Sequence, residues 1–145
     1  MKYNNLKKLN LSKNRLENID VFEKLNLNDL EELDLSYNKL KNINPLSKIN
    51  LVNLTDLNLS KNRINDINVL EFMNCPNLRG IDLLNNELTD ITVFERINFP
   101  QLIQISFAEN YFNHELIKNH DIISNLRKKG CNVTIWNTIK QILCD

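Results

Sequence analysis

Hydrophobic and polar residues alternate along this chain in a pattern that returns every 24 residues. Each copy opens with a segment such as LEELDL at 30–35, where leucines alternate with polar residues. A period of two predicts a strand with one buried face. A second apolar segment follows in each copy, for example VFEKL at 21–25. It is flanked by residues that typically begin and end a short helix. The pattern therefore predicts a strand, a turn, a short helix and a return in every copy.

Five copies share the same apolar positions and one asparagine: LKKLNLSKNRL, LEELDLSYNKL, LTDLNLSKNRI, LRGIDLLNNEL and LIQISFAENYF. They begin at Leu6, Leu30, Leu54, Leu78 and Leu102. The side-chain amide of the asparagine can form hydrogen bonds with backbone groups that have no partner in the turn. We expect a structural ladder of such bonds through Asn14, Asn38, Asn62, Asn86 and Asn110.

These copies resemble the leucine-rich repeat family, whose signature is L-x-x-L-x-L-x-x-N-x-L. The resemblance covers residues 6–112. It implies an α/β solenoid with a curved parallel sheet on the concave side and short helices on the convex side. We expect a single domain over 1–145, in which 113–145 form a C-terminal cap: a helix at about 115–129, a stop at Gly130 and a strand at 132–136.

The helical segments carry recognisable boundary residues. The predicted N-caps are Asp20, Asn44, Asn68 and Thr92. Pro45 is expected as a first helical residue, and glutamates three positions after the caps predict capping boxes at Glu23, Glu71 and Glu95. Left-handed residues are expected to end the helices at Asn26, Asn50, Asn74 and Asn98, which would explain why the chain has only 2 glycines.

The remaining repeated apolar residues predict the layer between sheet and helices: Ile19, Ile43, Ile67 and Ile91, with Leu25, Ile49, Met73 and Ile97. Cys75 lies in register with Leu27, Leu51 and Phe99, which indicates a small core residue. Tyr3 has the same register at the N-terminal end. Two interpretations remain open there. The chain is either the C-terminal part of a longer array, or a short protein whose first strand is covered by Tyr3, a partner or another copy.

Composition narrows the class of protein. The 145 residues include 18 basic and 18 acidic ones, and a net charge of zero disfavours a generally basic nucleic-acid binder. The odd number of cysteines (Cys75, Cys131, Cys144) favours reduced thiols. No signal peptide or membrane span is visible, so we expect a cytoplasmic protein that does not bind membranes. His114 and His120 form no metal spacing, no phosphate-binding glycine motif is present, and we predict neither a cofactor, a metal nor an enzyme.

The residues that the repeat leaves free form columns on the concave sheet, because neighbouring strands lie about 4.8 Å apart. The middle of this surface is acidic, with lysines at its rim, and Tyr37 lies between Lys13 and Lys61 in its column. Either this surface binds a basic peptide or protein surface, or it is a solvated face. The predicted contact residues are Glu32, Asp34, Tyr37, Asp56, Asp82 and Leu84. We expect Trp136 to pack under the terminal segment rather than to extend this surface.

Resemblance to the family implies a protein–protein interaction module that binds a protein partner through the concave face. The alternative is a structural or regulatory subunit that docks into a larger assembly, or onto a second copy, through its N-terminal end. In that case Tyr3, Leu9 and Leu11 would be the contact residues.

Overall fold

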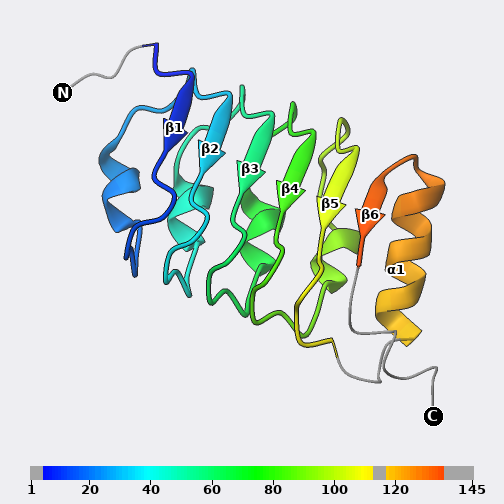
Figure 1. Ribbon diagram of the computed structural model, residues 1–145. Helices are drawn as coiled ribbons and strands as arrows, with labels where there is room; N and C mark the ends of the chain where they lie inside the picture. Colours follow the sequence, from blue (N-terminus) through cyan, green and yellow to red (C-terminus); the bar gives the residue numbers. More distant parts are fainter. Residues whose placement is uncertain (1–4, 113–116, 136–145) are drawn as a thin grey trace.

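Six short parallel strands lie side by side in sequence order, with short helices behind them (Figure 1). The structure, a computed structural model, describes residues 5–112 and 117–135. The strands are β1 (Lys8–Asn10), β2 (Glu32–Asp34), β3 (Asp56–Asn58), β4 (Gly80–Asp82), β5 (Gln104–Ser106) and β6 (Asn132–Thr134). The 3-10 helices are η1 (Asp20–Lys24), η2 (Asn44–Lys48), η3 (Asn68–Phe72) and η4 (Thr92–Glu95). The predicted leucine-rich repeat solenoid is confirmed.

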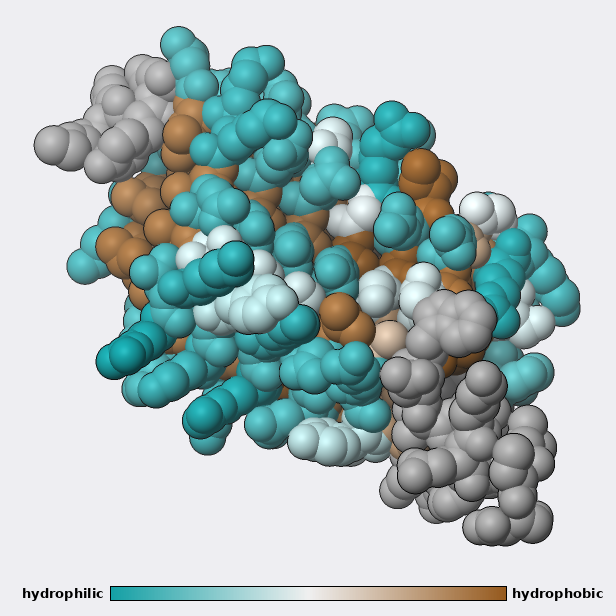
Figure 2. Space-filling view, viewed as in Figure 1, coloured by the Kyte–Doolittle hydropathy of each residue, from teal (hydrophilic) through white to brown (hydrophobic). Residues whose placement is uncertain are grey.

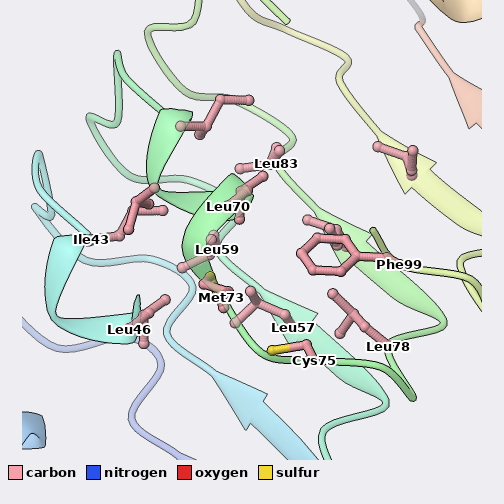
Figure 3. Packing of buried hydrophobic residues seen from close by; sticks show 14 of the residues in the cluster. Ile43, Leu46, Leu57, Leu59, Leu70, Met73, Cys75, Leu78, Leu83 and Phe99 are labelled. Carbon is pink, nitrogen blue, oxygen red and sulfur yellow. The ribbon is translucent and has the colours of Figure 1, made fainter. Parts of the chain in front are cut away.

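The core lies between the sheet and the 3-10 helices, and Figure 3 shows it as a continuous apolar layer. The four repeated isoleucines at the helix starts are buried as predicted, and so is Cys75, which lies near Leu57 and Leu78. Burial raises the pKa of the Cys75 thiol to about 12. A buried, protonated thiol packs as a small apolar side chain, which confirms the prediction for this residue.

The asparagines of the second to fifth repeats connect successive repeats, as predicted, whereas Asn14, among the described residues, bonds only to carbonyls of its own turn. Asn38 donates from Nδ2 to the carbonyl oxygens of Leu35, at 3.0 Å, and of Leu11 in the preceding repeat, at 2.9 Å. Its Oδ1 accepts the backbone N–H of Leu16 at 3.0 Å. The same set of bonds recurs at Asn62, Asn86 and Asn110. These side chains therefore form hydrogen bonds with backbone groups that stacking of the repeats removes from water.

The predicted helix caps are wrong. Asp20, Asn44, Asn68 and Thr92 are the first residues of their 3-10 helices and make no side-chain cap bond, and Pro45 is a second rather than a first residue. In three repeats the cap comes from two positions earlier, where Asn42, Asp66 and Asp90 accept the N–H of the first helical residue at 2.7–2.8 Å. A five-residue 3-10 helix is too short for the reciprocal bonds of a capping box.

The predicted left-handed residues are also wrong. Asn26, Asn50, Asn74 and Asn98 have no positive φ; the repeated left-handed position lies just before the buried asparagine, with φ of 54–56° at Lys13, Tyr37, Lys61, Asn85 and Glu109. Each such residue outside glycine costs about 1 kcal/mol. The position is held by the stack, because its N–H donates to the next repeat, as Tyr37 does to the Ser60 carbonyl at 3.0 Å.

The C-terminal elements follow the predicted order. Helix α1 (Ile117–Lys128) packs against β6 and η4, and Gly130 then takes a left-handed φ of 88° before β6 pairs with β5. The predictions for Tyr3, His114, Trp136 and Cys144 fall outside the described residues. No helix within residues 5–112 and 117–135 combines the length and apolar character needed to cross a membrane.

Candidate functional site

The concave face brings four predicted carboxylates onto three adjacent strands. Glu32 and Asp34 lie on β2, Asp56 on β3 and Asp82 on β4. The sheet register places Glu32 directly beside Asp56, while Asn58 lies between Asp34 and Asp82. Like charges at neighbouring sheet positions repel by about 1 kcal/mol or less when exposed to water. We call these four residues the acidic centre.

Two of these carboxylates also hold the backbone turn after their strand. Asp34 Oδ1 accepts the N–H of Ser36 at 2.9 Å, and Asp82 Oδ1 accepts the N–H of Leu84 at 2.9 Å. Asn58 makes the same bond to Ser60 at 3.0 Å, so the bond needs a side-chain oxygen and no charge. The turn therefore does not depend on the negative charge of Asp34 or Asp82, and the second oxygen of Asp34 accepts a hydrogen bond from Asn10 Nδ2 at 3.3 Å.

The acidic centre lines an open groove of about 740 Å³ along the sheet. Glu32 is paired with Lys8 at 2.6 Å, whereas Asp56 forms no ion pair with any described residue. The Asp56 carboxylate lies close over the backbone of Gly80 on β4, since a Cβ at position 80 would lie only 3.1 Å from Asp56 Oδ1. The middle of the groove therefore offers an accessible carboxylate.

Tyr37 occupies the left-handed turn after β2 with 46% of its surface exposed. Lysines from the repeats on either side lie over its ring, with the Nζ atoms of Lys13 and Lys61 at 5.9 and 4.4 Å from the ring centroid. Lys61 Nζ also donates to the Tyr37 hydroxyl at 2.6 Å, and this bond raises the pKa of the Lys61 amine. The ring thus lies next to cations from both neighbouring repeats.

Leu84 is not beside Tyr37. It lies half-buried in the turn after β4, and the third repeat separates the two residues: Lys61 donates its backbone N–H to the Leu84 carbonyl at 2.8 Å. Leu84 and Tyr37 therefore lie on opposite sides of the third repeat. Among residues 5–112 and 117–135, no group of three or more His, Cys, Asp or Glu side chains is arranged to hold a metal ion.

Sequence reasoning missed a second charged surface, along the turns that follow β1, β2 and β3. It consists of Lys13, Arg15, Lys39, Lys61 and Arg63, which we call the basic edge. Backbone bonds align these turns, since Lys39 N–H donates to the Leu16 carbonyl and Arg63 N–H to the Leu40 carbonyl, each at 2.9 Å. Basic residues recurring 24 positions apart were the signal that could have revealed it.

Several solved structures share the fold of this chain. Internalin F of Listeria monocytogenes is 23% identical, with a TM-score of 0.67 over 91% of this chain and 42% of its own. Internalin C2 of the same organism is 24% identical, with a TM-score of 0.61 over 90% of this chain and 61% of its own. A leucine-rich repeat protein of Leptospira interrogans is 23% identical, with a TM-score of 0.62 over 90% and 37%. This chain thus spans less than two thirds of each of these structures.

No curated protein sequence matches this chain. Two family models do: the leucine rich repeat model matches residues 4–64, and the model for two copies of leucine rich repeats matches 52–96. Together these matches cover more than half of the chain, and they coincide with the repeats from which the sheet and the asparagine ladder are built. The chain belongs to the leucine-rich repeat family.

Proposed function

We propose that this protein binds a basic polypeptide segment of a protein partner in the groove of its concave face. Leucine-rich repeats are a common protein–protein interaction module. The acidic centre supplies the charge, and Tyr37 and Leu84 supply contact area on its two sides. The observation that carries the proposal is Asp56: an exposed carboxylate beside Glu32 that forms no ion pair with a described residue.

A lysine or arginine of the partner would relieve the repulsion between neighbouring carboxylates that line the groove. Tyr37 favours binding for a second reason. Its ring is already oriented by Lys13 and Lys61, so little side-chain entropy is lost when a partner covers it. No catalytic role is proposed, because an open sheet face does not enclose a reacting group.

The test uses a fluorescein-labelled oligolysine peptide and a double variant, Asp56→Lys with Asp34→Asn. Asparagine at position 34 keeps the bond to the Ser36 N–H, as Asn58 does one repeat later, and loses only the exposed bond from Asn10, so we expect the fold to be preserved. We expect fluorescence anisotropy to show an affinity loss of about tenfold, equivalent to about 1.4 kcal/mol. Tyr37→Ala is expected to weaken binding by a further few-fold, or about 1 kcal/mol.

The matched control is Glu95→Lys with Asp121→Asn, which changes the net charge equally on η4 and α1, away from the groove. If control and groove variants lose the same affinity, binding depends on overall charge and the proposed site is wrong. Cross-linking of the intact protein to a captured partner, followed by mass spectrometry, would then locate the true contact surface.

A second candidate function is docking through the N-terminal end of the solenoid, onto another copy or into a larger assembly. Leu6, Leu9, Leu11 and Leu16 are only partly buried, whereas Leu30, Leu33, Leu35 and Leu40 at the same positions of the next repeat are at most 1% exposed. Figure 2 shows the corresponding hydrophobic surface at the end that carries β1. An apolar end of this kind favours association.

Sedimentation velocity over a wide range of protein concentration tests this second candidate. Association through the N-terminal end predicts a mass that rises with concentration, and Leu9→Arg is expected to restore the monomer because it places a charge in the contact. A monomeric mass at every concentration would exclude self-association and leave only docking to a different protein.

A further inference from the structure

Charged residues of successive repeats, 24 or 25 positions apart in the sequence, form four ion pairs within residues 5–112. Lys7 contacts Glu31 at 2.7 Å, and Lys8 contacts Glu32 at 2.6 Å. On the helix side, Glu23 pairs with Lys48 and Glu71 with Arg96, each at 2.8 Å. Because stacked repeats bring equivalent side chains close together, this alternation of sign removes repulsion from the stack.

The basic edge departs from this alternation, as the neighbouring carboxylates Glu32 and Asp56 of the acidic centre also do. Arg15, Lys39 and Arg63 occupy one position in three consecutive repeats, and Lys13 and Lys61 flank Tyr37 in the neighbouring column. None of the five cations forms an ion pair with a described acidic residue, and all are exposed or half-buried. Like charges stacked about 4.8 Å apart repel each other in the free protein. Figure 2 shows the hydrophilic surface over the turns below β1, β2 and β3.

We infer that the basic edge is a second docking surface, which binds an acidic polypeptide segment rich in Asp and Glu. Charge complementarity identifies this occupant, since carboxylates spaced along an extended segment would neutralise cations from three repeats at once. The inference is independent of the groove, which has the opposite sign. It would hold even if the acidic centre proved to be a solvated face.

Two features favour a polypeptide over a nucleic-acid strand. Beyond the third repeat the same two columns turn acidic, at Glu87 and Glu109, so the positive surface is short while the charge of a nucleic acid continues along the strand. Single-stranded nucleic acids also need a free aromatic face for base stacking. Successive bases would need several such faces, whereas Tyr37 is the one aromatic residue in these two columns over the first three repeats.

The experiment measures binding of a fluorescein-labelled oligoglutamate peptide to the full chain by fluorescence anisotropy, at several salt concentrations. The unmodified protein is expected to bind it with an affinity that falls as salt rises. The double variant Lys39→Glu with Arg63→Glu is expected to lose about tenfold or more in affinity. Its melting temperature is expected to stay about unchanged, because the attraction that Lys39→Glu gains to Arg15 is offset by the repulsion that Arg63→Glu creates with Glu87.

The matched control is Lys24→Glu with Arg79→Glu, which reverses one lysine and one arginine at exposed positions outside the basic edge. It is expected to keep the affinity for oligoglutamate within about twofold. The groove variant Asp56→Lys with Asp34→Asn should bind oligoglutamate at least as well as the unmodified protein, which separates this test from that of the proposed function. Equal losses in edge and control variants, or tighter binding of an oligouridylate of matched charge, would overturn the inference.

Discussion

Replacing Asn62 with alanine is expected to lower the free energy of unfolding by about 3–5 kcal/mol. Its Nδ2 donates to the carbonyl oxygens of Leu35 and Leu59 at 3.0 Å, and its Oδ1 accepts the N–H of Leu40 at 3.0 Å. Leu40 is fully buried, so its N–H would lose its partner without access to water. A buried polar group left unpaired costs about 1–3 kcal/mol, and several groups are affected at once.

The matched control is Asn14→Ala, at the same position of the first repeat. Asn14 is exposed, and its amide bonds only to the nearby carbonyls of Leu11 and Ser12, at 3.0 and 3.1 Å. We expect a loss of about 1 kcal/mol, the value of a hydrogen bond that water can replace. Urea denaturation followed by circular dichroism measures both variants. Similar losses at the two positions would show that the ladder does not owe its strength to burial.

Replacing Leu59 with alanine is expected to lower the free energy of unfolding by about 3–4 kcal/mol. Leu59 is 0% exposed and follows β3, between Leu35 and Leu83 at the same position of the neighbouring repeats. A stack of equivalent leucines cannot close the resulting cavity, because each neighbour is held by its own repeat. The measurement is again urea denaturation, with thermal unfolding as a second probe.

Leu11→Ala is the control, because Leu11 occupies the same position in the first repeat and is only partly buried. Its truncation is expected to cost about 1 kcal/mol, in proportion to the smaller apolar area that it removes from water. A loss equal to that of Leu59→Ala would mean that the N-terminal end is covered, which would contradict docking through an apolar end.

Much of the fold could be predicted from the sequence because its signals are periodic. The leucines of LEELDLSYNKL recur at fixed offsets, so strand, register and core follow from one repeat unit. Asn38 and its equivalents were also predictable, since a buried amide after a strand has few other uses. The same regularity predicts that Glu32 lies beside Asp56, and the pairing of β2 with β3 confirms this register.

The sequence led to wrong predictions where residues at two positions could play the same local role. Asparagine occurs at both Asn42 and Asn44, and either could cap η2; the structure selects Asn42. Left-handed backbone favours asparagine or glycine, yet Tyr37 and Lys61 adopt it, because their N–H groups bond to the next repeat. Tertiary hydrogen bonds outweighed the intrinsic preference of these residues.

The sequence by itself determined the repeat, the parallel sheet, the asparagine ladder and the columns on the concave face, since each depends on spacing along the chain. The tertiary structure alone decided which charges are paired and which are free. Lys8 forms an ion pair with Glu32, whereas Asp56 and the cations of the basic edge form none with a described residue. It also placed two lysines over Tyr37. The reason is physical: such contacts join side chains 24 residues apart, and their geometry exists only after the repeats have stacked.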